Sequence, residues 1–311
     1  MNRVVIALGG NALLRKNDRQ DFVTQVRRAK EALSSIADVI NDHQVVITHG
    51  NGPQVGNILL QNEIAREQVV PMPLDVCGAM SQGLISQAIF QAYESIRVST
   101  GIDKDAVSIF TRTLVSADDE AFDNPSKPIG PFYTDNKARK LREQFGWPLV
   151  QITGKGWRRV VPSPTPIEIL EAGVIKSLLA DNYLPIGVGG GGVPVIKTES
   201  GYRGVEAVID KDLASAVLAT NVGADSLMIL TDVDHVYKSF GTDDEEAIGK
   251  ISLGEMKSIL KNNRFENGSI LPKIRAALNF VENGGKRAYI TSLEYGKRAM
   301  EEDYGTVIYS D

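Results

Sequence analysis

Two short segments rich in glycine and asparagine occur early in the chain, each directly after a β-branched run. Glycine has no Cβ, so backbone N–H groups at such strand ends can approach an anion, and a following helix N-terminus adds a favourable dipole. A tight strand-to-helix turn explains either segment equally well when it is taken alone. Two of them in neighbouring strand–helix units predict a cradle for a phosphate-like anion. The residues concerned are Gly9, Gly10, Asn11, Gly50, Asn51 and Gly52.

A third candidate is the run of four glycines from 189 to 192, which follows another apolar segment. Four consecutive glycines are costly in folding entropy, so they indicate a close backbone approach, and we include Gly190 and Gly191 among the phosphate-binding candidates. No Gly-Lys-Ser/Thr follows, which excludes a Walker P-loop. His49 precedes the second glycine segment. We expect it to be packed at a strand end, because phosphoryl transfer needs little proton chemistry.

Two lysines near predicted helix starts are candidates for binding phosphate oxygens. Lys211 stands between two carboxylates, of which Asp212 could hold lysines in position, and Lys273 falls in the first turn of a later helix. An exposed salt-bridge cluster and an ordinary surface lysine are the alternatives. Asp232 and Tyr237, after a further apolar run, could line a purine site or belong to a polar turn.

The elements that must position these residues alternate along the chain. Runs that are apolar at consecutive positions predict strands buried on both faces of a mainly parallel sheet. They span 4–8, 45–48, 107–110, 184–188, 227–230 and 288–291. Helices are expected over 21–41, 54–66, 75–100, 165–180, 212–221, 253–262 and 271–282. This alternation predicts an open α/β sandwich whose ligands bind at the carboxyl ends of the strands.

The alternation is interrupted from about 116 to 161. Four prolines and many charges occur there, followed by a segment that predicts a hairpin turning at 154–156. We interpret this stretch as an inserted subdomain, and insertions of this length in α/β enzymes often serve as lids. A surface excursion without function is the alternative.

Composition excludes several classes of protein. Of the 311 residues, 42% are hydrophobic and 23% charged, which is typical of a folded globular chain. With a formal net charge of −5, no global feature indicates binding to nucleic acid or to an anionic membrane. Cys77 is the only cysteine, so an intrachain disulfide cannot form, and the apolar run at the N-terminus is too short for a signal sequence or a membrane span. We expect a cytoplasmic protein.

The order of these segments resembles the carbamate kinases of the amino-acid-kinase superfamily. The resemblance extends from residue 3 to about residue 307. The segments that carry it are 7–13, 48–56, 75–83, 127–133, 156–164, 189–192, 204–212 and 282–285.

The resemblance implies one domain over 1–311, a three-layer αβα sandwich around a mainly parallel open sheet. The insertion at about 116–161 would be a protruding lid, the nucleotide site would lie in the C-terminal half at about 184–311, and the protein would be a homodimer. It implies reversible phosphoryl transfer between ATP and carbamate, in which ADP and carbamoyl phosphate are the other pair of substrates. Mg²⁺ is expected to arrive on the nucleotide phosphates, without a metal site of the protein's own.

The resemblance also assigns roles to residues. The implied catalytic residues are Lys211, Asp212, Lys273, Lys127 and Asn11. The implied phosphate-binding residues are those of the glycine segments. The implied nucleotide-binding residues are Asp232, Tyr237, Lys211 and Lys273. Two alternatives stay open. One is a catalytically silent nucleotide-binding module on the same fold, and the other is a kinase for a different small acid, which the segments at 127–133 and 156–159 disfavour.

Overall fold

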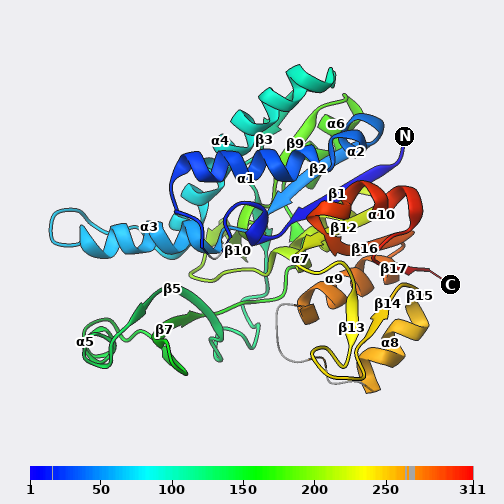
Figure 1. The fold of residues 1–311 in the computed structure, drawn as a ribbon. Coiled ribbons are helices and arrows are strands. Elements are labelled where there is room, and N and C mark those ends of the chain that lie inside the picture. The colour runs from blue at the N-terminus through cyan, green and yellow to red at the C-terminus, as the bar shows by residue number, and fades with distance from the viewer. Residues whose placement is uncertain (16, 263–264, 266–269, 311) are drawn as a thin grey trace.

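An eight-stranded, mainly parallel sheet forms the centre of the computed structural model (Figure 1). The structure describes residues 1–15, 17–262, 265 and 270–310, and for Asn11 it describes the backbone alone. The strand order is β15-β17-β16-β12-β1-β2-β9-β3, and only the β16–β17 pair is antiparallel. The strands are β1 Arg3–Leu8, β2 Gln44–His49, β3 Ala106–Ser108, β9 Leu184–Gly187, β12 Ser226–Thr231, β15 Lys250–Ser252, β16 Arg287–Ser292 and β17 Thr306–Tyr309.

The central strand β1 is buried on both faces. Val4, Ile6 and Leu8 belong to one hydrophobic core, whereas Val5 and Ala7 belong to the other. Successive side chains of a strand point to opposite faces, so a run of consecutive apolar residues is what two helix layers require. The sequence-based prediction of a doubly covered parallel sheet is therefore confirmed, as are all six predicted strands.

Helices cover the two faces of the sheet. One layer contains α1 Phe22–Ser34, α2 Ala37–Asp42, α4 Leu74–Thr100 and α10 Gly296–Glu302. The other contains α6 Ala172–Ala180, α7 Lys211–Val222, α8 Leu253–Asn262 and α9 Ile270–Glu282. The result is the three-layer αβα sandwich expected from the sequence.

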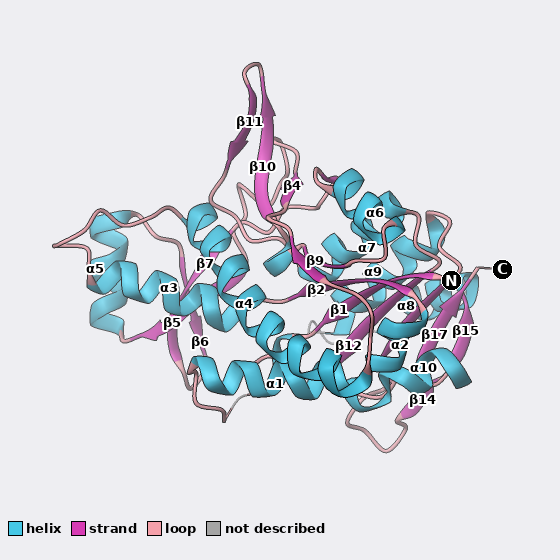
Figure 2. Cartoon of the chain, turned by 90° about the horizontal axis from the view of Figure 1, so that it is seen from above, coloured by secondary structure: helices cyan, strands magenta, loops and turns pink. Residues whose placement is uncertain are grey.

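Three smaller sheets flank this sandwich (Figure 2). One sheet consists of β5 Lys127–Tyr133, β7 Gly156–Val161 and β6 Leu149–Ile152. It carries α5 Asp135–Phe145 and contacts α3 Gly52–Ile64. We call residues 127–161 the projecting subdomain. The predicted hairpin is present as the antiparallel pair β6–β7. The other two sheets consist of β11 Gly201–Gly204, β10 Val193–Thr198, β4 Arg112–Leu114 and β8 Glu168–Ile169, and of β13 Val236–Lys238 and β14 Glu246–Ile248.

Two helix predictions were wrong in extent. The helix expected over 21–41 is divided into α1 and α2, because the Ser35 hydroxyl donates to the carbonyl of Ala32 and the chain turns at Ile36 before it becomes helical again. The helix expected over 165–180 begins only at Ala172, because Glu168 and Ile169 pair with β4 as strand β8. Within the described part of the chain, no helix is long and apolar enough to cross a bilayer.

Candidate active site

The two N-terminal glycine segments lie side by side at the carboxyl ends of β1 and β2. Gly9 donates its N–H to the carbonyl of Leu230 over 3.0 Å, and the chain then enters a short 3-10 turn, Gly10–Ala12. A Cβ on Gly50 would lie 3.7 Å from the Cα of Gly10 and 3.7 Å from Cδ of Lys211. The structure thus brings together segments that are far apart in the chain. The side chain of Asn11 lies outside the described part.

The four-glycine run closes against the second segment. Gly190 has a φ of 65°, and a Cβ there would lie 2.1 Å from Nδ2 of Asn51, so a side chain could not be accommodated without displacing that amide. Asn51 is buried and donates from Nδ2 to Oγ of Ser81 over 2.9 Å. Gly52 begins α3, so its N–H belongs to a helix N-terminus. Gly191 packs against the backbone of Ile209.

Asp212 binds both candidate lysines. Its Oδ1 accepts from Nζ of Lys211 over 2.6 Å, and its Oδ2 accepts from Nζ of Lys273 over 3.1 Å. Asp212 and Lys273 are buried, and the side chain of Lys211 is 13% exposed. Burial alone would raise the pKa of Asp212, but the charges of the two lysines and their hydrogen bonds outweigh it, so the pKa lies below its ordinary value. The carboxylate is therefore ionised at neutral pH and holds two ammonium groups together.

Asp210 connects this group to the projecting subdomain. Its Oδ1 accepts from the backbone N–H of Asp212 over 3.0 Å, which caps the N-terminus of α7, and its Oδ2 accepts from Nζ of Lys127 over 3.0 Å. Sequence reasoning noted Asp210 only as a neighbour of Lys211 and gave it no role. The signal was an Asp immediately before a predicted helix, the usual position of a capping residue.

His49 is fully buried behind the glycines, as the sequence predicted. Its Nδ1 lies 3.0 Å from the carbonyl of Gly50, and a Cβ on Gly189 would lie 2.6 Å from its Cε1. Burial, partly offset by the bond to Gly50, lowers the pKa of His49 to about 4. The ring is therefore neutral at physiological pH and adds no charge to the site.

The two residues predicted for the nucleotide side lie after β12. Asp232 lines a cavity of about 250 Å³ together with Gly9 and Ser292, at the ends of three neighbouring strands. Tyr237 lies on β13, where its hydroxyl donates to Oδ1 of Asp234 over 2.7 Å, and this bond raises the pKa of Tyr237 to about 12. The structure thus places Asp232 beside the first glycine segment and Tyr237 on a neighbouring short sheet.

The ammonium groups at the strand ends favour binding of an anion. Asp212 binds both lysines, which brings two ammonium groups to these strand ends. No group of three or more His, Cys, Asp or Glu side chains that could hold a metal ion occurs among the residues described. Backbone amides and ammonium groups around a small anion are the arrangement that phosphoryl transfer requires.

Comparison with known proteins identifies the family. The model of the amino acid kinase family matches residues 2–292. The chain belongs to this family. Among similar proteins of the family, the carbamate kinase of Thermoplasma acidophilum is 46% identical over 308 residues, and that of Thermococcus kodakarensis is 46% identical over 312 residues, each alignment covering 99% of both chains.

A solved structure supports the same assignment. The carbamate kinase from Giardia lamblia bound to AMP-PNP superposes with a TM-score of 0.94 at 43% identity, covering 100% of this chain and 99% of that one. Within the amino acid kinase family, the chain therefore groups with the carbamate kinases, and it is a kinase. The resemblance seen in the sequence and the predicted fold class are confirmed.

Proposed function

We propose that this enzyme transfers a phosphoryl group reversibly between ATP and carbamate, so that ATP and carbamate give ADP and carbamoyl phosphate. The observation that carries the proposal is the convergence of Gly10, Gly50 and Lys211, with Asp212 holding Lys211 beside Lys273. Full-length similarity to carbamate kinases supports the choice of acceptor.

The transferred phosphoryl group carries negative charge on three equatorial oxygens between two anionic partners, so alignment and charge neutralisation are the main tasks. We assign Lys211 and Lys273 to the phosphate oxygens on the nucleotide side. The backbone amide of Gly10 is assigned to the group in transfer, whereas Gly50, whose N–H donates to the carbonyl of Leu8 over 3.2 Å, allows the close approach of Gly10 and Lys211. A preorganised donor of this kind contributes roughly 3–4 kcal/mol to lowering the barrier.

The remaining predicted residues complete this assignment. We place Asn11, Asn51 and the amides of Gly52 and Gly190 around the phosphoryl group. Gly9 and Gly191 are assigned to the same loops as positions without a Cβ, because their N–H groups already donate to the carbonyls of Leu230 and Val188. Lys127 belongs at the carbamate end, because it reaches the site from the projecting subdomain and binds Asp210 there. Asp232 and Tyr237 are proposed for the nucleotide side, with the nucleotide site in the C-terminal half, about 184–311.

Mg²⁺ is proposed to enter with the nucleotide, whose phosphate oxygens would hold it and where it would neutralise phosphate charge. The donor set supports this, because Asp212 already binds two ammonium groups and has little capacity left for a cation. What the chain itself supplies is therefore positive charge and N–H donors.

The insertion at about 116–161 is proposed to act as a lid over the carbamate end.

We also propose a homodimer in the cytoplasm. Support for an oligomer comes from α4, on which Val76, Met80 and Leu84 recur at helical spacing and are 37%, 49% and 37% exposed, an apolar stripe suited to a second copy. Light scattering on the purified protein tests this: a monomer at micromolar concentration would exclude the dimer.

The decisive experiment measures ATP formed from ADP, Mg²⁺ and carbamoyl phosphate by the purified protein, with Lys211→Ala as the control. We expect the control to be slower by roughly 100- to 1,000-fold. Acetyl phosphate, offered in place of carbamoyl phosphate, tests for a different acceptor acid. Equal rates with the two donors would contradict the carbamate assignment, and no ATP above the control would favour a silent nucleotide-binding module.

A further inference from the structure

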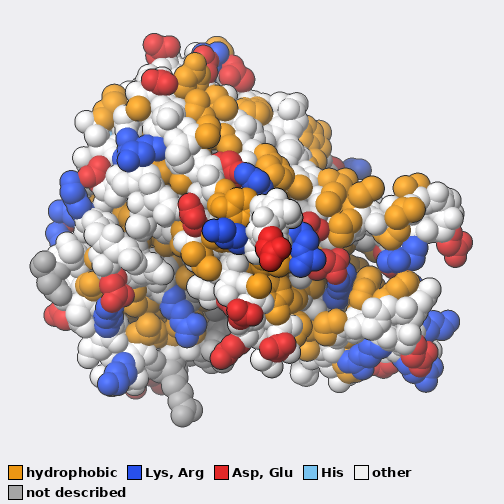
Figure 3. Space-filling view, turned by 180° about the vertical axis from the view of Figure 1, so that it is seen from behind, with side chains coloured by type: hydrophobic (Ala, Val, Ile, Leu, Met, Phe, Trp, Pro, Cys, Tyr) orange, Lys and Arg blue, Asp and Glu red, His pale blue; other side chains and the backbone are white. Residues whose placement is uncertain are grey.

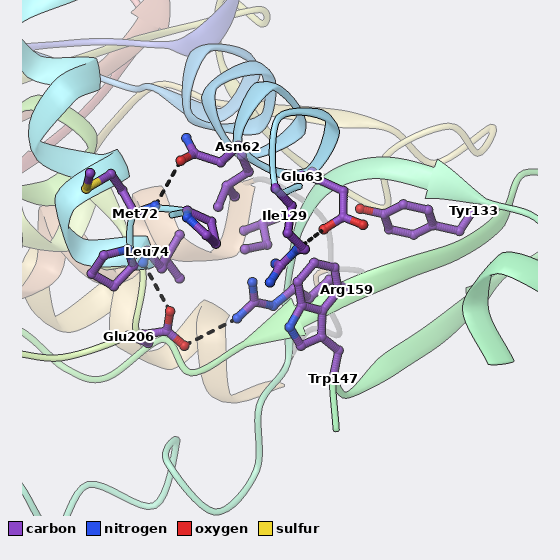
Figure 4. Close-up of a pocket in the computed structure, with 14 residues that line it drawn as sticks. Asn62, Glu63, Met72, Leu74, Ile129, Tyr133, Trp147, Arg159 and Glu206 are labelled. Atoms are coloured by element: carbon purple, nitrogen blue, oxygen red, sulfur yellow. Dashed lines mark hydrogen bonds and ion pairs between the residues drawn. The ribbon is translucent and has the colours of Figure 1, made fainter. Parts of the chain in front are cut away.

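A second cavity, of about 220 Å³, lies between α3 and the projecting subdomain. Figure 4 shows Glu63 entering it from α3, Tyr133 and Arg159 from the subdomain and Glu206 from the loop after β11. In the space-filling view the end of α3 and the subdomain form two lobes with a notch between them (Figure 3). None of the lining residues in the described part is one to which we assigned a role in phosphoryl transfer.

Arg159 in this cavity is a largely enclosed cation with few partners among the described residues. Its side chain is only 12% exposed, and its one hydrogen bond to another side chain in the described part, from Nη2 to Oε2 of Glu206, is long at 3.4 Å. Its Nε is buried and has no hydrogen-bond partner among the described residues. Leaving a charged donor buried and unpaired costs free energy, so a group that accepts from this edge of the guanidinium would be bound favourably.

The orientation of the guanidinium favours a planar acceptor. One face of Arg159 lies over Trp147, with 4.4 Å between Cζ and the ring centroid. The ring occupies a face and leaves the N–H edge for an acceptor in the plane of the guanidinium. A carboxylate matches that edge with two parallel hydrogen bonds.

The charges around the cavity limit the ligand to one negative charge. Glu63 pairs with Arg66 over 3.3 Å and with Lys137 over 3.5 Å, so its charge is already offset. Glu206 is shared between Arg159 and the backbone N–H of Leu74. Arg66 and Arg159 balance the two carboxylates that line the cavity. Lys137, which pairs with Glu63 from α5 without lining the cavity, adds one positive charge, which a monocarboxylate would balance and a dicarboxylate would exceed.

We propose that this cavity binds a small organic monocarboxylate. Its carboxylate would take the place of Oε2 of Glu206 at Nη2 of Arg159 and would then accept from the neighbouring Nε as well. Its apolar part would lie against Leu59 and Ile129, which also line the cavity. Because Leu59 belongs to α3 and Ile129 to β5, the bound molecule would touch both the body of the enzyme and the projecting subdomain. Its binding is thus linked to the position of that subdomain.

The test is titration calorimetry of the full-length protein with butyrate, and with butyramide as the uncharged analogue of the same shape. We expect butyrate to bind with a dissociation constant at least about tenfold lower than that of butyramide, since only the carboxylate forms charge-assisted hydrogen bonds with Arg159. Equal affinities, or no butyrate binding at millimolar concentrations, would overturn the proposal.

Variants identify the site. Arg159→Gln should weaken butyrate binding by about tenfold or more, whereas Arg139→Gln, on the exposed face of α5 in the same subdomain, should not change it. Glu206→Gln removes the competing anion and should tighten binding, a result that does not require Arg159→Gln to fold. Lys211→Ala tests whether butyrate binds in this cavity and not in the phosphoryl-transfer site. Retained butyrate binding in this variant supports the proposal, and loss of butyrate binding in Lys211→Ala alone would contradict it.

Discussion

Replacing Asp212 by Asn tests whether one carboxylate organises the lysines. The substitution keeps the shape of the side chain and turns one acceptor oxygen into an NH₂ donor. Since Oδ1 accepts from Lys211 and Oδ2 from Lys273, one of the two ammonium groups would then face a donor. The side chain of Asp212 is 4% exposed and those of the lysines are 13% and 10% exposed, so water cannot readily replace the lost partner.

The expected magnitudes follow from that burial. Removing one partner of a buried ion pair costs about 3–5 kcal/mol of folding free energy. The lysine that loses its partner also loses its position, so kcat should fall by roughly 100- to 1,000-fold. Because the phosphates of ADP supply the missing negative charge, saturating ADP should raise the stability of Asp212→Asn more than that of the wild type.

Urea unfolding at several pH values, with and without ADP, measures the stability, and the coupled ATP assay measures kcat. Folding lowers the pKa of Asp212. The carboxylate therefore contributes fully to the free energy of unfolding when the pH is above its unfolded pKa of 3.8, and this contribution is lost as the pH falls through the lower pKa of the folded protein. The difference between wild type and Asp212→Asn should therefore be constant near neutral pH and shrink in strong acid. A variant with wild-type kcat and a stability loss under about 1 kcal/mol would refute this account of the site.

Three further predictions concern other parts of the site. Lys127→Ala should raise KM for carbamoyl phosphate far more than KM for ADP, because Lys127 is assigned to the carbamate end; equal increases would remove it from that role. Gly190→Ala should destabilise the protein by about 1–3 kcal/mol and lower kcat, because the residue has positive φ and a Cβ would collide with Asn51. Gly173→Ala, with open space around it, is the control. Urea unfolding measures the stability of both variants. The pKa of His49 is about 4 in the folded protein and 6.5 in the unfolded chain. The contribution of His49 to the free energy of unfolding is therefore full above pH 6.5 and falls by roughly 3 kcal/mol as the pH drops to 4. His49→Gln should flatten that part of the plot of stability against pH, and an unchanged plot would show that the ring is not held neutral.

The central sheet could be predicted from the sequence because its strands are buried on both faces and therefore read as uninterrupted apolar runs. Three other elements, β15, β17 and α5, were not predicted. β17 and β15 are short, and α5 lies in a segment rich in proline and charge and buries only Ala138 and Leu141. We did not predict this helix because the prolines and charges of 116–161 led us to interpret the whole stretch as an irregular insertion, although Thr134 caps the helix by accepting from the N–H of Lys137.

For the site, the sequence predicted which strand ends would meet, because the carboxyl ends of parallel strands share one edge of the sheet. It did not predict the bond between Asp210 and Lys127. That contact depends on how the projecting subdomain packs against α7, and no local pattern encodes such a contact between distant segments. The under-paired state of Arg159 was equally invisible, since it is a property of what surrounds the side chain in three dimensions.

The position of β1 in the middle of the sheet affects how the chain folds during synthesis. Val4 lies opposite Ser226 on β12 and opposite Val45 on β2, so one side of the first strand is completed early and the other only after most of the chain has left the ribosome. Until then, β1 and β2 present an open hydrogen-bonding edge and apolar side chains to the surroundings. Pairing over so long a sequence separation is slow, and intermediates of this kind are prone to aggregation, so the unpaired edge of β1 is an aggregation risk until β12 arrives.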